Sequence, residues 1–249
     1  MPAGRRRGIP ALLWLVGAVV LVSSGCAAWR IGQSIELARR SEPLQQSPAA
    51  PTLRLLIVGD STAVGTGATS PATSLAGLLA RDHPQLLVEN RARDGARFAD
   101  VMAQLDGDAP FDIVLVQAGG NDVIRLGRLD ALQAGIDAVA DRARERAALV
   151  VLMPAGNVGN APFFFAPVSW WMTHRSRAMH RFVEQAARRT SAVYVNLFHE
   201  RATDPFVRDP QLNAADGLHP SDAGYRLWQR ELLLQSDLTQ RLKTAGRAG

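Results

Sequence analysis

Cysteine is almost absent from this sequence: Cys26 is the single one, so no disulfide bond can form within the chain. Cysteine usage therefore indicates no redox compartment. The sequence also lacks a cluster of basic residues interleaved with aromatic ones, which is typical of proteins that bind nucleic acids. No segment of about 20–50 residues is repeated, which argues against solenoids and propellers. We therefore expect no nucleic acid among the partners and one non-repetitive domain.

Positive charge is concentrated near the N-terminus. Residues 1–52 hold six arginines and two glutamates, whereas the remainder, with 22 basic and 21 acidic residues, contributes little to the net charge of +5. The chain has 249 residues, of which 47% are hydrophobic, and can therefore bury a sizeable core. This length suits one α/β domain with an extension.

The N-terminal residues 1–29 have the form of a signal sequence or membrane anchor. The basic triplet Arg5–Arg7 precedes an uncharged, largely apolar stretch, Gly8–Trp29, which contains small residues after its apolar part. Three outcomes stay open: an uncleaved anchor, lipidation of Cys26 at a site that resembles a bacterial lipoprotein signal, or cleavage near Ala28. All three export the domain, so we expect an exported protein, membrane-anchored on the periplasmic or extracellular side.

Residues 30–52 are rich in proline and polar residues and are expected to form a linker. From residue 53 onward, short apolar runs alternate with longer amphipathic ones, which predicts successive βαβ units. The expected fold is a three-layer α/β/α sandwich around a flavodoxin-like, five-stranded parallel sheet, as one domain over residues 53–249. The expected strands are 53–58, 86–89, 113–117, 149–153 and 193–196, and the expected helices are 74–82, 98–105, 129–146, 172–189 and 222–242.

The strand over 53–58 runs directly into Gly59-Asp60-Ser61-Thr62. Ligands bind at the carboxyl ends of the strands in open parallel sheets, so Ser61 is expected where chemistry usually takes place. The simpler interpretation is that Ser61 only caps the helix that follows, as serine often does. The other loops must decide between the two interpretations.

Three further loops bring functional side chains to the same edge of the predicted sheet. Gly95 follows the second strand, Asn121 follows the third, and Asp216 and His219 precede the last helix. A serine hydroxyl needs an adjacent base to act as a nucleophile, and an imidazole suits this role. A carboxylate can orient that imidazole, and donors such as a backbone N–H and an asparagine amide can stabilise an oxyanion.

These four blocks, in this order and spacing, resemble the SGNH/GDSL-type serine esterases and lipases, although Thr62 stands where the short family name has leucine. The resemblance covers most of residues 53–235 and implies Ser61 as nucleophile, His219 as base and Asp216 as its orienting carboxylate. It also implies an oxyanion hole built from the N–H groups of Ser61 and Gly95 and the side chain of Asn121. The nucleophile elbow of α/β-hydrolases is excluded, because Ala63 occupies its final glycine position.

Several other polar residues have a simpler explanation. A metallophosphoesterase site needs several histidines and carboxylates, and only His219 lies in a suitable loop, so we expect no metal and no cofactor. Asp60 and Asp122 are expected to hydrogen-bond to backbone in turns rather than to act as a catalytic pair. Asn157 is a turn residue or a substrate contact. The four other histidines are expected in surface or structural roles.

The stretch 161–172 contains three phenylalanines and two tryptophans, interrupted by prolines. Two interpretations are open: these rings form an acyl-binding lip or a patch on the bilayer, or they pack over helices.

The sequence therefore predicts a hydrolase that cleaves carboxylic esters, from a small molecule or a lipid, through an acyl-serine intermediate at Ser61. The aromatic stretch and the N-terminal segment favour acyl or phospholipid esters. The alternatives are a cell-envelope carbohydrate O-acetylesterase and a non-catalytic binding domain that keeps the fold.

Overall fold

The computed structural model describes residues 8–238, 240 and 242, and leaves aside the side chains of residues 8–12, 16, 18–24, 26 and 27. The first element is one long helix, α1 (Gly8–Arg40). The triplet Arg5–Arg7 of the predicted signal sequence lies outside the described residues, as do the side chains of most of its apolar stretch. In the described part of the chain, no helix combines the length and apolar character that crossing a membrane requires.

Five parallel strands form one sheet in the spatial order β2-β1-β3-β4-β5, which confirms the expected flavodoxin-like topology. In the centre, Leu55 lies beside Val88 on one side and Ile113 on the other. The strands are mostly apolar because both faces of the sheet are covered. Their bounds are β1 (Leu53–Gly59), β2 (Leu86–Asn90), β3 (Phe111–Gln117), β4 (Ala147–Leu152) and β5 (Val193–Tyr194).

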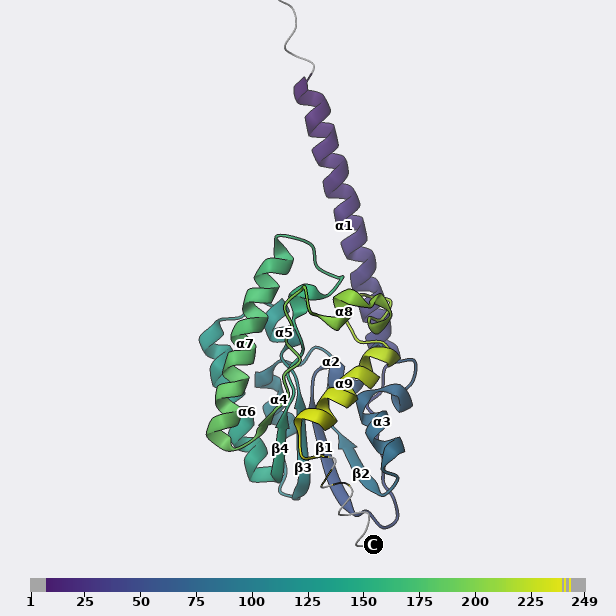
Figure 1. The fold of residues 1–249 in the computed structure, drawn as a ribbon. Helices are drawn as coiled ribbons and strands as arrows, with labels where there is room; N and C mark the ends of the chain where they lie inside the picture. The colour runs from purple at the N-terminus through teal and green to yellow at the C-terminus, as the bar shows by residue number, and fades with distance from the viewer. Residues whose placement is uncertain (1–7, 239, 241, 243–249) are drawn as a thin grey trace, which may run out of the picture.

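Helices cover both faces of the sheet, as Figure 1 shows. Alternate side chains of β1 point to opposite faces: Leu55 and Ile57 pack with α3 and α9, whereas Leu56 and Val58 pack with α4, α6 and α7. The three-layer sandwich is therefore confirmed. The helices after α1 are α2 (Ser61–Val64), α3 (Leu75–Asp82), α4 (Phe98–Gln104), α5 (Gly120–Ile124), α6 (Leu129–Arg146), α7 (Val168–Thr190), α8 (Pro205–Arg208) and α9 (Asp222–Gln235). Short 3-10 turns lie at Pro71–Thr73, Val158–Asn160 and Pro210–Leu212.

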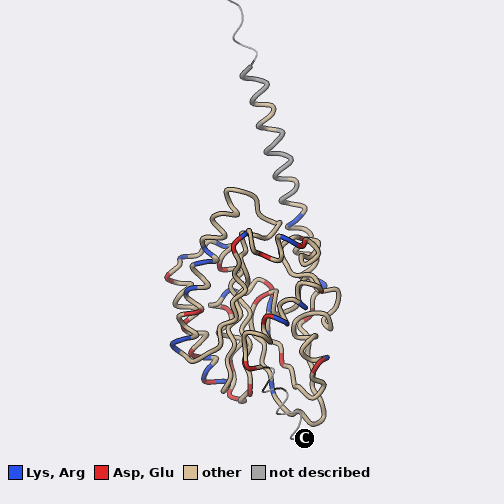
Figure 2. The backbone as a smooth tube through the Cα atoms, viewed as in Figure 1, with Lys and Arg blue, Asp and Glu red and all other residues tan. Residues whose placement is uncertain are grey.

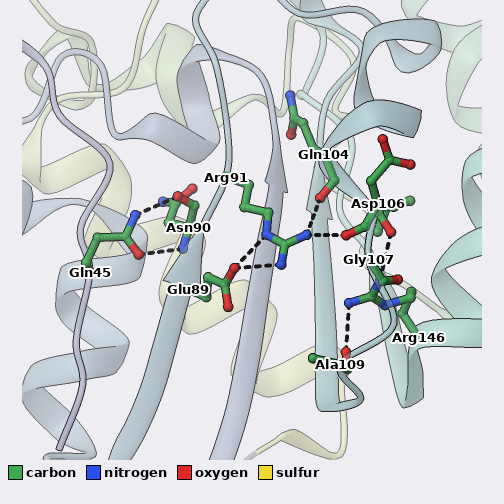
Figure 3. A network of polar contacts seen from close by, with 10 residues as sticks. Gln45, Glu89, Asn90, Arg91, Gln104, Asp106, Gly107, Ala109 and Arg146 are labelled. Carbon is green, nitrogen blue, oxygen red and sulfur yellow. Dashed lines mark hydrogen bonds and ion pairs between the residues drawn. The ribbon is translucent and has the colours of Figure 1, made fainter.

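The segment expected as a linker differs from that expectation. Residues 30–40 belong to α1, and the following residues lie along the free edge of β2. Gln46 exchanges two backbone hydrogen bonds with Val88, at 3.0 and 2.9 Å. The side chain of Gln45 bonds both the N–H (3.0 Å) and the carbonyl (2.6 Å) of Asn90 (Figure 3). An edge strand has unpaired backbone groups, and two glutamines satisfy some of them here.

Arginines inside the fold hold the loop between α4 and β3. Arg91 bonds the carboxylate of Glu89 at 2.6 Å and the carbonyl of Asp106 at 2.6 Å (Figure 3). Arg146, which is buried, donates to the carbonyls of Gly107 and Ala109. These guanidinium groups satisfy loop carbonyls, so part of the positive charge serves the fold.

The carboxyl ends of the strands and α1 lie at the same end of the domain. In Figure 1, α2 begins directly above β1, and α1 rises away from that upper end. The loop that leads into α7 rises beside it. The predicted functional loops, α1 and the aromatic stretch are therefore gathered at one end.

The aromatic stretch 161–172 forms that raised loop and the start of α7. Some of its rings are packed and others are exposed. Phe164 packs against the core, whereas Phe165, Trp170 and Trp171 are 59%, 71% and 60% exposed. The loop carries no acidic or basic residue, and Figure 2 shows it in the neutral colour. The guanidinium of Arg30, from α1, lies 4.8 Å from the centre of the Phe165 ring and donates to the carbonyl of Pro162.

Candidate active site

The turn between β1 and α2 depends on a glycine. Gly59 has a φ of 148°, and a Cβ atom there would lie 1.8 Å from the carbonyl oxygen of Gln117. Any side chain would therefore push β1 away from β3. The amide of Gln104 bonds the N–H of Gly59 at 2.7 Å and its carbonyl at 3.0 Å, which fixes the backbone just before Ser61.

Asp60, and not Ser61, caps α2, which corrects the expectation that Ser61 caps the helix. Its Oδ1 accepts from the backbone N–H of Thr62 at 2.9 Å and from the Thr62 hydroxyl at 2.7 Å. Burial raises the pKa of the Asp60 carboxyl despite these bonds. Asp60 therefore has the turn-forming role that its position predicts. Because the carboxylate of Asp60 accepts from the N–H of Thr62, the hydroxyl of Ser61 in the first turn is left for another partner.

That partner is His219. Its Nε2 lies 2.8 Å from the Ser61 hydroxyl oxygen, and its Nδ1 lies 2.6 Å from Oδ2 of Asp216. The three side chains thus form one continuous hydrogen-bonded chain. A carboxylate can only accept, so Nδ1 carries a proton and Nε2 of the neutral ring is free to accept from Ser61.

The local fold positions Asp216 for this contact. Oδ1 of Asp216 accepts from the backbone N–H groups of Leu218 and His219, at 3.0 and 3.1 Å, which leaves Oδ2 for the imidazole. Burial alone would raise the pKa of Asp216, but the hydrogen bonds from the His219 ring and from the backbone N–H groups of Leu218 and His219 lower it below its ordinary value. The carboxylate therefore stays ionised beside the histidine.

The loop that carries Gly95 is joined by hydrogen bonds to the segment that follows Ser61. The side chain of Asn90 donates to the carbonyl of Ala63 at 2.8 Å, and the Thr66 hydroxyl donates to Asp94 at 2.7 Å. Gly95 itself has a φ of 76°, a conformation that favours glycine. These bonds hold the backbone of Gly95 next to α2.

Asn121 lies in the first turn of α5, after β3. Its Nδ2 donates to the carbonyl of Ala96 at 3.2 Å, and this bond uses one of its two amide hydrogens. The other hydrogen is available for a ligand. Asn121, Gly95, Ser61 and His219 line the same cavity, so the structure brings together the four positions that the sequence singled out.

This cavity has a volume of about 280 Å³. Its lining surface is mainly apolar, although about as many of the lining residues have polar side chains, Asn157, Asn160 and Asp204 among them. The apolar or aromatic residues of the lining are Ile35, Ala38, Ile124, Ala155, Val158, Ala161, Leu197, Pro205, Phe206, Leu218, Pro220, Leu227 and Trp228. A mainly apolar surface with a limited number of polar groups is usual in a site for a small organic ligand.

Asp122 and Asn157, for which the sequence predicts turn-forming roles, both hydrogen-bond to the backbone. Oδ2 of Asp122 accepts from the N–H of Phe98 at 3.1 Å, and burial raises the pKa of Asp122 to about 6. Asn157 bonds the N–H of Gly159 and the carbonyl of His199, and it also lines the cavity. Asn157 is therefore both a turn residue and part of the cavity wall. In the part of the chain that the structure describes, no three His, Cys, Asp or Glu side chains gather as a metal site requires.

Sequence reasoning missed Gln104, Tyr225 and the cavity-lining residues of α1. The Tyr225 hydroxyl, fully buried, donates to the carbonyl of Thr66 at 2.8 Å and so supports the same turn. Gln104 had a signal: it lies three residues after Val101, on the apolar face of a helix, where a polar side chain needs a buried partner. The cavity-lining residues of α1 had no such signal in the sequence, because the composition of residues 30–52 indicated a linker.

Comparison with known proteins agrees with this geometry. Residues 57–227 match the model of the GDSL-like Lipase/Acylhydrolase family. The chain is 27% identical over 201 residues to a protein described as GDSL-like esterase Rv1075c, from Mycobacterium tuberculosis; the match covers 76% of this chain and 64% of that relative. The chain therefore spans less than two thirds of the length of the curated relative that it matches.

Solved structures with the same fold include TesA, with a TM-score of 0.59 and 22% identity over 73% of this chain and 97% of that one. An acetylxylan esterase from Geobacillus stearothermophilus, Axe2, has a TM-score of 0.53 and 24% identity over 75% and 94% of the two chains. At these identities the likeness concerns the fold. The family is shown by the match over residues 57–227: the chain belongs to the GDSL-like lipase/acylhydrolase family, as its four sequence blocks predict.

Proposed function

We propose that this protein is an esterase that hydrolyses carboxylic esters through an acyl-serine intermediate at Ser61. The observation that carries the proposal is the hydrogen-bonded chain from Ser61 through His219 to Asp216, inside a cavity that also contains Gly95 and Asn121. A serine that only capped a helix would have no need of a histidine and a buried carboxylate aligned behind it.

In the first half of the reaction, Oγ of Ser61 attacks the carbonyl carbon of the ester while Nε2 of His219 takes the hydroxyl proton. The bond from carbonyl carbon to alkoxide oxygen then breaks, and His219 returns the proton to the departing alcohol. In the second half, His219 takes a proton from water, which attacks the acyl-serine. The ester bond to Ser61 breaks, Oγ recovers its proton, and the acid is released.

Two features stabilise the charged states in this sequence. Asp216 accepts the Nδ1 proton of His219 in a hydrogen bond and stabilises the imidazolium that forms. The oxyanion accepts hydrogen bonds from the backbone N–H groups of Ser61 and Gly95 and from Nδ2 of Asn121. Donors fixed in advance are effective because they need not reorganise as the charge develops.

The proposal is tested with the Ser61→Ala variant and short p-nitrophenyl esters. We expect hydrolysis to fall to the uncatalysed rate while the thermal unfolding midpoint stays within a few degrees. A fluorophosphonate probe separates an enzyme from a non-catalytic binding domain, because only an activated serine is labelled. Full activity of Ser61→Ala, or no labelling of the wild type, would falsify the proposal.

The apolar lining of the cavity favours acyl esters over acetyl groups on carbohydrate, because side chains such as Ile124 and Leu218 offer no hydrogen bond to a sugar. The comparison of p-nitrophenyl acetate, butyrate and octanoate tests this choice. We expect a higher kcat/KM for the longer chains. If acetate is preferred and acetylated sugars are deacetylated faster, the substrate is a carbohydrate ester.

We also propose that the protein is exported and stays tethered at the membrane surface through its N-terminal segment. The support is the basic triplet Arg5–Arg7, the apolar stretch after it, and the exposed Trp170 and Trp171 in the first turn of α7. Expression of the full chain followed by fractionation tests this proposal. We expect activity in the membrane fraction and digestion by protease added outside the cytoplasmic membrane; activity confined to the cytoplasm would contradict it.

A further inference from the structure

The last turns of α1 are part of the cavity that contains Ser61. Ser34, Ile35 and Ala38 line it, although they lie outside residues 57–227, which match the family model. Ala38 lies four residues after Ser34 and three after Ile35, so its side chain neighbours both of theirs on the helix surface. The cavity wall thus includes residues from the segment 30–52, whose composition predicted only a linker.

This part of α1 is held in place on both sides. Arg30 stacks on Phe165 at 4.8 Å and donates to the carbonyl of Pro162, which joins α1 to the aromatic loop. Beyond the end of the helix, Gln45 and Gln46 bond the edge of β2. Anchored before and after, residues 34–38 have a defined position relative to the cavity.

Two other helices complete this wall with apolar groups. Phe206 of α8 and Leu227 and Trp228 of α9 line the cavity, and the rings of Phe206 and Trp228 lie 6.0 Å apart. The polar side chains that these three helices add to the lining are Ser34 and Glu231. Such a wall offers dispersion contacts and few hydrogen bonds, which suits a hydrocarbon chain and not a sugar.

We propose that α1 forms a binding subsite for the aliphatic acyl chain of the ester, with Ile35 and Ala38 in contact with the chain. The proposal rests on the proposed esterase function for the reacting end of the substrate. The N-terminal segment then has two roles, because the helix that leads away from the domain also sets its preference for chain length.

A pair of matched variants tests this subsite. Ile35 is 48% exposed and lines the cavity, whereas Ile31, one turn earlier on α1, is 49% exposed and is not among the lining residues. We expect Ile35→Asp to raise KM for p-nitrophenyl octanoate about ten-fold, the effect of removing one apolar side chain from contact with ligand. KM for the acetate ester should rise by much less, and Ile31→Asp, outside the cavity lining, should change neither KM value.

A second variant acts in the opposite way on the same wall. Ala38→Phe would fill space that the acyl chain needs, so we expect a much larger loss of octanoate hydrolysis than of acetate hydrolysis. An unfolding midpoint within a few degrees of the wild type shows that the variant is folded. If octanoate and acetate respond equally to Ile35→Asp or Ala38→Phe, or if Ile31→Asp matches Ile35→Asp, the subsite does not exist as proposed.

Binding of a product separates this proposal from the esterase proposal. Decanoate is titrated by calorimetry into the full-length Ser61→Ala protein, with and without Ile35→Asp. We expect the Ser61→Ala protein to bind decanoate, and the protein that carries both Ser61→Ala and Ile35→Asp to bind it about ten-fold more weakly. An inactive wild type with Ile35-dependent decanoate binding would overturn the esterase and keep the subsite; activity without Ile35-dependent binding would do the reverse.

Discussion

His219 and Ser61 are separated by 158 residues in the sequence, and yet Nε2 of His219 lies 2.8 Å from the Ser61 hydroxyl oxygen. The fold produces this contact because β1 ends at the nucleophile turn, and the loop before α9 crosses the same end of the sheet. Gly67 illustrates how close the two segments are, since a Cβ atom there would lie 2.4 Å from the carbonyl oxygen of Pro220. Ser61 and His219 are thus brought together by the packing of two loops.

Asp216→Asn should lower kcat by about 10⁴-fold, the loss seen when the carboxylate of such a triad is replaced by an amide. An amide can donate to Nδ1 and so favours the tautomer whose Nε2 carries the proton, which cannot then accept from Ser61. Rates with p-nitrophenyl butyrate measure this loss. The unfolding midpoint serves as the control. A loss below ten-fold would show that Asp216 does not orient His219 in the reaction.

Much of the fold was predictable because the strands are short, mostly apolar runs, and the central ones are buried on both faces. The helix predicted over 129–146 coincides with α6, since its apolar residues repeat on one face. The five strands, their parallel order and the placement of Ser61, Gly95, Asn121, Asp216 and His219 at one edge all follow from this pattern. The four blocks are far apart in the sequence, but each lies in a loop at the same edge of the parallel sheet, so the topology brings them together.

Other features depend on contacts that have no local pattern. The glutamines at 45 and 46 stabilise an edge strand through backbone pairing, which depends on the tertiary position of β2 and not on their composition. The wall formed by Ile35 depends on how α1 packs at the end of the domain. Each is a long-range property, and the sequence around it is compatible with a loop.

Asn121→Ala should lower kcat by about 10²–10³-fold with little change in KM, because an oxyanion donor acts mainly in the transition state. Steady-state kinetics with the butyrate ester measure both constants. Asn157→Ala is the control, since Asn157 lines the same cavity but donates to the carbonyl of His199. We expect a change in kcat below ten-fold for this control. Equal losses for the two variants would mean that Asn121 has no special contact with the oxyanion.

Gln104→Ala should destabilise the protein by about 2 kcal/mol, because it leaves the N–H of Gly59 buried without a partner. Urea unfolding measures the free energy. Gln133→Ala, at an exposed position of α6, provides the control for the exchange of glutamine for alanine in a helix, and should change stability by less than about 0.5 kcal/mol. If both variants are equally stable, the bond to Gly59 adds nothing.

His180 should make the stability of the protein fall in mild acid. Its Nε2 lies 2.8 Å from the carbonyl oxygen of Ala155, which can only accept, so the neutral ring donates there and accepts from the Tyr194 hydroxyl at 2.6 Å. Burial lowers the pKa of His180 from 6.5 to about 4. Between these values the unfolded chain binds a proton that the folded protein does not, so the free energy of unfolding decreases as pH falls from about 6.5 to 4.

The full effect is at most about 3–4 kcal/mol, from the shift at about 1.4 kcal/mol per pH unit. His180→Gln isolates it, because a glutamine amide can donate to Ala155 and accept from Tyr194 without titrating. We expect urea unfolding of this variant, measured from pH 4 to 8, to lose less stability in acid than the wild type. His174→Gln, at an exposed position of the same helix, should follow the wild type. If His180→Gln also follows the wild type, then the buried imidazole takes up its proton without breaking these bonds, and the acid sensitivity of the fold has another origin.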